Sequence, residues 1–239
     1  IKTNQEEEKM RESILTIPVN DVFGPREGCP ICRMRDSIEE HIGEYIMGAA
    51  MMEPDVRIET NKSGFCSTHY NQLLKQNNRL SLALMLSTHM AEKQKELFEA
   101  KRPFGKGKKV EQFGSTCFVC SKVNWGVNHT LETVFQMYVK DEAFRKLFSN
   151  QEFICMPHYK LLLTKGGESM NKGDFAGFKK ALDKLVGDYM KQLTSDVEEF
   201  CQSFDYRNAG KLHNEDMEHV RTSVQRAIEF LTGRKALEK

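Results

Sequence analysis

Apolar residues along most of this chain recur every three or four positions, which is the spacing of one face of an α-helix. The pattern predicts helices after Cys32, over 79–100, after Cys120, over 141–148, from Asp174 to Phe204, and from about Asn214 onward. Asp174 is a favourable N-cap residue for the longest of these helices. No segment alternates between apolar and polar residues for long enough to build a sheet. The sequence therefore predicts an all-α fold.

Six of the seven cysteines belong to a motif that occurs twice. The first copy is Cys29 and Cys32 followed by Cys66 and His69, and the second copy is Cys117 and Cys120 followed by Cys155 and His158. The gap between the two halves of a copy is 33 residues in the first and 34 in the second. A repeat of this length indicates two related helical halves, which we interpret as zinc-knuckle repeats followed by a C-terminal pair of long helices.

The chemistry of zinc explains this choice of residues. Zn²⁺ prefers four tetrahedral nitrogen or sulfur ligands, and three cysteines with one histidine form a closed set of that kind. We expect each copy to hold one structural zinc ion, which makes two ions per chain. A closed set leaves no coordination position for a substrate or an activated water, so the metals argue for a structural role.

Other uses of the cysteines explain the pattern less well. Disulfides give no reason for a histidine in the fourth position of both copies, and free redox thiols do not need the paired spacing. An iron–sulfur cluster is the alternative cofactor, although histidine is its less usual fourth ligand. The seventh cysteine, Cys201, falls on the apolar stripe of the long helix and is expected to be a buried, inert thiol.

The repeat and the composition suggest four segments in chain order. Residues 1–100 contain the first repeat with an N-terminal extension, and residues 113–170 contain the second. Between them, residues 101–112 form a basic linker that is rich in lysine and contains proline and glycine. Residues 171–239 form the C-terminal helical pair.

Several sequence runs resemble a known family. These runs are EPDVR at 53–57, TNKSGFC at 60–66, NRLSLALML at 78–86, the second Cys-x2-Cys, and FDYRN at 204–208. Together they are similar to a family of bacterial proteins of unknown function that is common in anaerobic Gram-positive bacteria. The resemblance covers nearly the whole chain and implies both copies of the cysteine motif and a bacterial cytoplasmic setting. It implies no activity, substrate or partner.

One segment is a candidate ligand site because of its polar residues. The chain from Met51 to Phe65 is expected to be irregular, and long irregular stretches in compact domains are often functional. The candidate ligand-binding residues are Glu53, Asp55, Arg57, Asn61, His89 and Arg207. The competing interpretation is a solvated loop whose charges pair locally, with Arg207 in the C-terminal turn of a helix. His41 is expected at the core or its boundary.

Charge and missing motifs narrow the function. The 35 basic and 34 acidic residues nearly balance, which argues against a dedicated nucleic-acid binder. The chain has no nucleotide-binding or hydrolase motif, and no apolar run long enough to cross a bilayer. The leading hypothesis is a cytoplasmic, zinc-stabilised, non-catalytic binding or adaptor protein whose partner is a protein or small molecule. The alternatives are an enzyme or small-molecule binder using 53–62, a redox or metal sensor, and a nucleic-acid binder.

Overall fold

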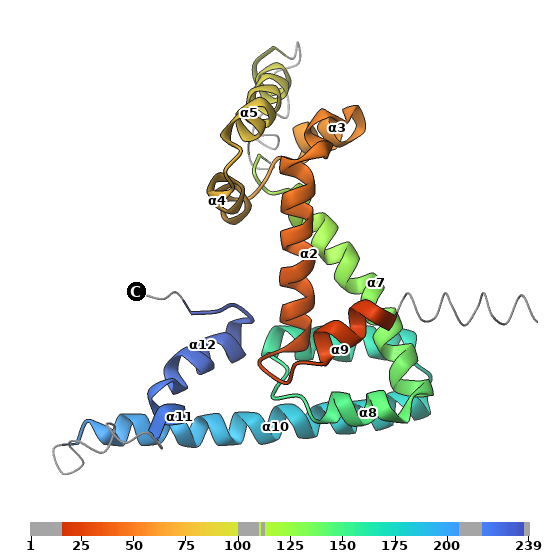
Figure 1. The fold of residues 1–239 in the computed structure, drawn as a ribbon, viewed down its shortest axis with the longest axis vertical. Coiled ribbons are helices and arrows are strands. Elements are labelled where there is room, and N and C mark those ends of the chain that lie inside the picture. Colours follow the sequence, from red (N-terminus) through yellow and green to blue (C-terminus); the bar gives the residue numbers. More distant parts are fainter. Residues whose placement is uncertain (1–15, 100–109, 111–112, 206–216, 237–239) are drawn as a thin grey trace, which may run out of the picture. The chain divides into compact units, whose positions relative to one another are not determined.

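The computed structural model describes residues 16–99, 110, 113–205 and 217–236 (Figure 1). Every regular element in these ranges is a helix, which confirms the all-α fold. None of the described helices is long and apolar enough to span a membrane. Most of the expected basic linker, 101–112, lies outside the described residues.

The chain forms two compact units. Residues 35–127 make one, which we call the inserted unit, and residues 1–34 and 128–239 make the other, which we call the two-segment unit. Helices α2 (Pro30–Met47) and α7 (Phe118–Lys140) contribute residues to both. The segments expected in chain order stay a prediction, and the two-segment unit combines residues that precede the inserted unit with residues from the second repeat and the C-terminal segment.

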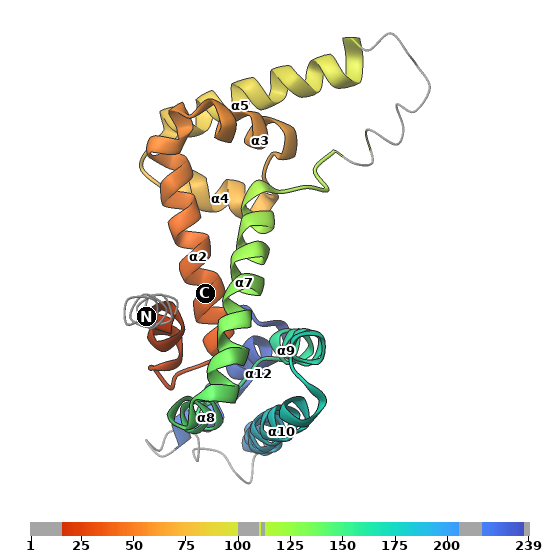
Figure 2. The same ribbon diagram turned by 90° about the vertical axis from the view of Figure 1, so that its right-hand side faces the viewer.

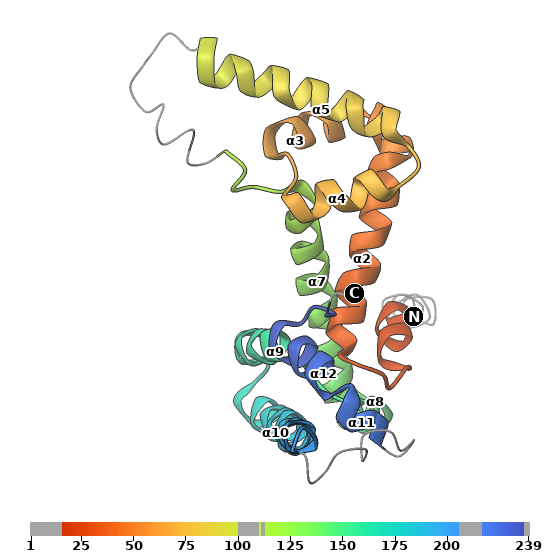
Figure 3. The ribbon, with the colours of Figure 1, turned by 90° about the vertical axis from the view of Figure 1, so that its left-hand side faces the viewer.

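The two-segment unit is built around one long helix, α10 (Lys172–Ser203). Helices α8 (Glu142–Ser149), α9 (Met156–Ser169), α11 (Glu218–Arg221) and α12 (Ser223–Thr232) all contact α10 (Figure 3). Interlocked aromatic rings fill the core beside it. Neighbouring rings in this cluster have centroids 5.0–5.9 Å apart; its members are Phe23, Phe135, Tyr138, Phe144, Phe148 and Phe178.

The long helix begins three residues earlier than its sequence suggested. Asn171 is its N-cap, and the Asn171 side chain accepts a hydrogen bond from the Asp174 backbone N–H at 2.9 Å. Asp174 therefore lies in the first turn, where the positive end of the helix dipole stabilises a carboxylate. The expectation for Cys201 is wrong, because this cysteine is exposed at the end of the helix, where the apolar stripe leaves the core.

The inserted unit contains shorter helices (Figure 2). They are η1 (Ala49–Met52), α3 (Pro54–Ser63), α4 (Ser67–Lys75), α5 (Arg79–Gln94) and the π-helical η2 (Lys95–Glu99). The expectation of an irregular segment between Met51 and Phe65 is wrong. Pro54 takes the first helical position, where its missing N–H costs nothing, and Asp55 follows in the first turn. Gly64 ends α3 with φ 62° and ψ −159°, a conformation open essentially only to glycine.

Helix α5 is less buried than its apolar sequence suggested. Its buried residues are Ser81, Leu82 and Met85, on the face that packs against α3. Leu80 is 69% exposed and Met90 is 60% exposed. His41, expected at the core or its boundary, is also exposed and bonds the backbone oxygen of Ser37. The inserted unit thus has a thin hydrophobic core for its length.

A buried ion pair joins α10 to α12. Asp196, 2% exposed, accepts a hydrogen bond from Arg226 Nη2 at 2.6 Å and another from Gln192 Nε2 at 2.8 Å. Arg226 also donates to the His219 backbone oxygen. A buried carboxylate of this kind is tolerated only because these donors satisfy it.

Replacing Asp196 with alanine is expected to destabilise the two-segment unit by about 3 kcal/mol, because Arg226 loses its counter-charge in a largely buried position. Urea unfolding monitored by circular dichroism measures the change. Asp188→Ala on the same helix is the matched control, since its ion pair with Lys184 is exposed and worth at most about 0.5 kcal/mol. Equal destabilisation by the two substitutions would contradict a special role for Asp196.

Candidate metal centres

The eight residues of the repeated motif lie in two clusters, and the clusters combine the two copies. Cys29 and Cys32 lie with Cys155 and His158, and we call this cluster the first centre. Cys66 and His69 lie with Cys117 and Cys120, and we call this the second centre. The expectation that each copy closes its own site is corrected: the Cys-x2-Cys of each copy pairs with the Cys-x2-His of the other. Sequence spacing could not reveal this, since both pairings use the same residues.

The first centre is buried in the two-segment unit. His158 Nδ1 lies 3.5 Å from Cys29 Sγ, 3.4 Å from Cys32 Sγ and 3.1 Å from Cys155 Sγ. The sulfur atoms of Cys32 and Cys155 are 3.6 Å apart. His158 is the most exposed of the four residues at 8%.

The second centre has the same form in the inserted unit but is more open. His69 Nδ1 lies 3.1 Å from the sulfurs of both Cys66 and Cys117 and 3.4 Å from that of Cys120. The sulfurs of Cys66 and Cys120 are 3.9 Å apart. All three cysteines here are partly exposed, whereas those of the first centre are buried.

Every ligand pair stands at the start of a helix. Cys29 and Cys117 immediately precede α2 and α7, while Cys66 and Cys155 are the N-caps of α4 and α9. The second ligand of each pair comes three residues later, on the same face of the first turn. Each centre therefore joins two helix N-termini, whose dipoles favour thiolate over thiol.

The distances suit a tetrahedral ion. With Zn–S bonds of about 2.3 Å and a Zn–N bond of about 2.0 Å, tetrahedral geometry places two sulfurs about 3.8 Å apart and a sulfur and nitrogen about 3.5 Å apart. Four of the six ligand pairs in each cluster are 3.1–3.9 Å apart, and all four ligand atoms of a cluster lie within 4.8 Å of one another. The donor set and its spacing thus fit a metal ion held by four side chains.

Electrostatics within each cluster favour a bound cation. Burial works to raise the pKa of Cys117, but hydrogen bonds from His69 and backbone N–H groups outweigh it and hold the pKa at about 6. Burial and the neighbouring Cys117 raise the pKa of Cys120 to about 12. Hydrogen bonding with Cys29 raises the pKa of Cys155 to about 12 in the first centre. Cys29 in the first centre and Cys117 in the second therefore ionise easily while Cys155 and Cys120 resist, and a dication offsets the repulsion between neighbouring thiolates.

A carboxylate supports the histidine of the second centre. Glu39 Oε1 accepts from His69 Nε2 at 2.6 Å, and Glu39 Oε2 accepts from Gln72 Nε2 at 3.2 Å. Glu39 is only 9% exposed. This arrangement fixes the ring so that Nδ1 faces the sulfurs and makes the histidine a better ligand. The residue at the corresponding place in the second repeat, ten after its first cysteine, is Val127, so sequence comparison of the copies gave no signal for Glu39.

The other candidate ligand residues mostly hold α3 against α5. Arg57 donates to the Leu84 backbone oxygen at 3.1 Å and to Thr88 Oγ1 at 2.8 Å. Asn61 Oδ1 accepts from Thr88 at 2.7 Å. Tyr45 donates to Glu53 at 2.9 Å, and Asp55 lies in the first turn of α3. Arg207 lies outside the described residues. Arg57, Asn61 and His89 thus lie along the contact between α3 and α5, and a ligand site there stays a prediction.

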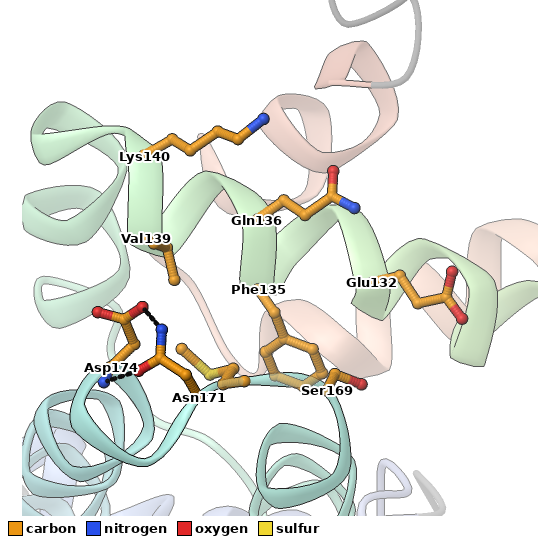
Figure 4. Close-up of a pocket in the computed structure, with 9 residues that line it drawn as sticks. Glu132, Phe135, Gln136, Val139, Lys140, Ser169, Asn171 and Asp174 are labelled. Atoms are coloured by element: carbon orange, nitrogen blue, oxygen red, sulfur yellow. Dashed lines mark hydrogen bonds between the residues drawn. The ribbon is translucent and has the colours of Figure 1, made fainter.

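His89 does line a cavity beside the second centre. The cavity has a volume of about 670 Å³ and lies between the end of α3, the later part of α5 and the residues before Cys117. A second cavity of about 390 Å³ lies in the two-segment unit near the start of α10 (Figure 4). There the Asn171 and Asp174 side chains bond each other at 2.5 Å, so the polar groups at that cavity's edge are already paired.

Fold and centres together define an all-helical protein with two Cys3His clusters that could each hold a metal ion. The chain belongs to a family of unknown function, DUF6062, whose model matches residues 10–238. No curated protein and no solved structure matches the chain.

Two double variants test the crosswise pairing. Cys66→Ser/Cys117→Ser removes two ligands of the second centre only, and we expect the protein to retain one metal ion per chain. Cys29→Ser/Cys66→Ser damages both centres, and we expect it to retain none. Metal analysis of the purified proteins measures both. Pairing within each copy predicts the reverse result for each variant, so the experiment separates the two arrangements.

Glu39→Ala is expected to lower the metal affinity of the second centre by about 10- to 100-fold, because His69 loses the carboxylate that orients it. Equilibrium competition with a chromophoric chelator measures the affinity. Glu40→Ala, an exposed neighbour on the same helix, is the control and should leave both centres unchanged. Unchanged affinity in Glu39→Ala would show that the hydrogen bond contributes nothing to the centre.

Proposed function

We propose that this protein is a zinc-stabilised, non-catalytic scaffold that binds a small molecule or a protein partner. The observation that carries the proposal is the closed donor set of each cluster, with three sulfurs and one nitrogen around one point. Four protein ligands satisfy tetrahedral zinc and leave no position for substrate. Zinc suits this donor set better than an iron–sulfur cluster for two reasons. One ligand of each cluster is an imidazole, and the ligand atoms are close enough together to surround a single ion.

The thin core of the inserted unit supports a structural role for the metal over a catalytic one. The inserted unit has few fully buried large side chains, and its second centre joins the start of α4 to the start of α7. Small cores of this kind commonly rely on a metal for stability. In this proposal the zinc ions fix the loops that precede Cys66 and Cys117, and the surface around those loops recognises the partner.

Metal analysis of protein purified without oxygen tests the proposal. We expect two zinc ions per chain, no iron and no visible absorption, and replacement by Co²⁺ should give the spectrum of a tetrahedral thiolate site. Removing zinc with a chelator should unfold the inserted unit, seen as loss of helical circular dichroism. Iron with a charge-transfer spectrum would overturn the assignment, and so would full helicity after complete removal of the metal.

The cysteines of the second centre are more exposed than those of the first centre. This difference favours a second function, which is thiol-based sensing at the second centre. Its three cysteines are partly exposed, and the sulfurs of Cys66 and Cys120 are 3.9 Å apart. Hydrogen peroxide can oxidise two zinc-bound thiolates to a disulfide, with uptake of two protons and formation of two waters, and the ion is then released. The buried sulfurs of the first centre are shielded from this reaction.

Zinc release under peroxide distinguishes sensing from a purely structural role. Sensing predicts release of one ion per chain while the first centre keeps its ion, measured with a zinc-responsive dye. Reversal by a thiol reductant and added zinc should follow. Retention of both ions at peroxide concentrations that oxidise free cysteine would exclude the sensing function.

A further inference from the structure

The cavity beside the second centre has the size and lining of a small-molecule site. Its volume of about 670 Å³ is within the range typical of ligand pockets. Apolar and aromatic side chains provide most of the wall; they are Phe65, Tyr70, Leu86, Met90, Leu97 and Phe113. The other lining residues include Lys62, His89, Lys93 and Glu96, whose polar groups can orient a ligand.

Two rings with similar orientation line this cavity. His89 and Phe113 stack with an interplanar angle of 26° and centroids 6.3 Å apart. His89 Nδ1 donates to the Asn61 backbone oxygen at 2.6 Å, so the imidazole ring is held in place and Nε2 is left as an acceptor. Phe113 is 53% exposed although it is a large apolar ring. A planar aromatic ligand would cover it.

One lysine at the cavity is available to pair with a singly charged anion. Lys62 and Lys93 against Glu96 give 2 − 1 = +1 among the lining residues. Glu96 bonds Lys93 at 2.9 Å, while Lys62 makes no ion pair within the described part of the chain. A zinc ion bound by the three thiolates of the second centre would add a charge of −1 behind the part of the cavity wall formed by Phe65 and Thr116. That negative charge opposes ligands of higher charge, such as nucleotides.

The cavity wall depends on the second centre. Gly64 and Phe65 directly precede Cys66, and Ser115 and Thr116 directly precede Cys117. The two loops are joined by hydrogen bonds from Phe118 N to Gly64 O at 2.9 Å and from Thr116 Oγ1 to Ser63 O at 2.8 Å. A Cβ on Gly64 would lie 2.8 Å from the His89 ring, so glycine is needed for the histidine to reach its position.

We propose that this cavity binds a small planar aromatic acid with one negative charge, its ring against His89 and Phe113 and its carboxylate toward Lys62. This inference rests on the proposed scaffold function and names the class of molecule that the scaffold holds. Because the metal loops form the wall, occupancy of the second centre and ligand binding are coupled.

Titration of the zinc-loaded full-length protein with 2-naphthoate tests the proposal, with the probe's own fluorescence as readout. We expect saturable binding of one molecule per chain. Phe113→Ala should weaken binding about tenfold and Lys62→Glu about fivefold, from loss of ring contact and of one ion pair. Leu231→Ala is the control, because Leu231 lines a separate apolar groove between α10 and α12 that could also take an aromatic probe.

Three outcomes overturn the inference. One is naphthoate binding that Leu231→Ala weakens and Phe113→Ala does not, and another is equally tight binding of neutral 2-naphthamide or of adenosine monophosphate. The third is absence of binding by protein that holds two zinc ions, which rejects the ligand class while leaving the scaffold intact. If the purified protein contained no zinc, that result would instead reject the proposed scaffold function. The metal content of each sample therefore shows whether the ligand class or the scaffold function has failed.

Discussion

This structure depends on one constraint: the ligands of each metal centre come from both copies of the repeated motif. Each centre takes one ligand pair from each copy of the motif, so neither copy can complete a metal site by itself. The first centre joins ligands separated by 123 residues in the chain, from Cys32 to Cys155. The second joins His69 to Cys117 across 48 residues, and all its ligands lie between those of the first. This nesting explains why the inserted unit interrupts the two-segment unit in sequence.

Much of the fold follows from local sequence. Helical spacing of apolar residues, the short helix over 141–148 and the apolar stripe of α10 are visible without a structure, and the structure confirms the all-α class. The prediction from sequence failed at a few individual positions. Pro54 and Gly64 start and stop a helix in a polar stretch that resembles a loop in sequence, and Cys201 is exposed near the end of α10 although it falls on the apolar stripe.

The eight candidate metal ligands can be identified from spacing alone, but their pairing cannot. The same eight residues satisfy two arrangements, and only tertiary contacts choose between them. Glu39 was missed for the same reason, since it lies on the helix of one motif and supports the histidine of the other centre. Arg57 illustrates the opposite case: a charged residue in a conspicuous run whose hydrogen bonds only join two helices.

The nested order of the ligands also has a consequence for synthesis on the ribosome. Cys29 and Cys32 emerge early, and the first complete donor set to follow is completed by Cys66 and His69, which is the wrong pairing. Closing that shorter loop costs about 1 kcal/mol less entropy than closing the native one. A nascent chain that binds zinc before Cys117, Cys120, Cys155 and His158 have been translated can therefore be trapped with its ligands in the wrong pairing.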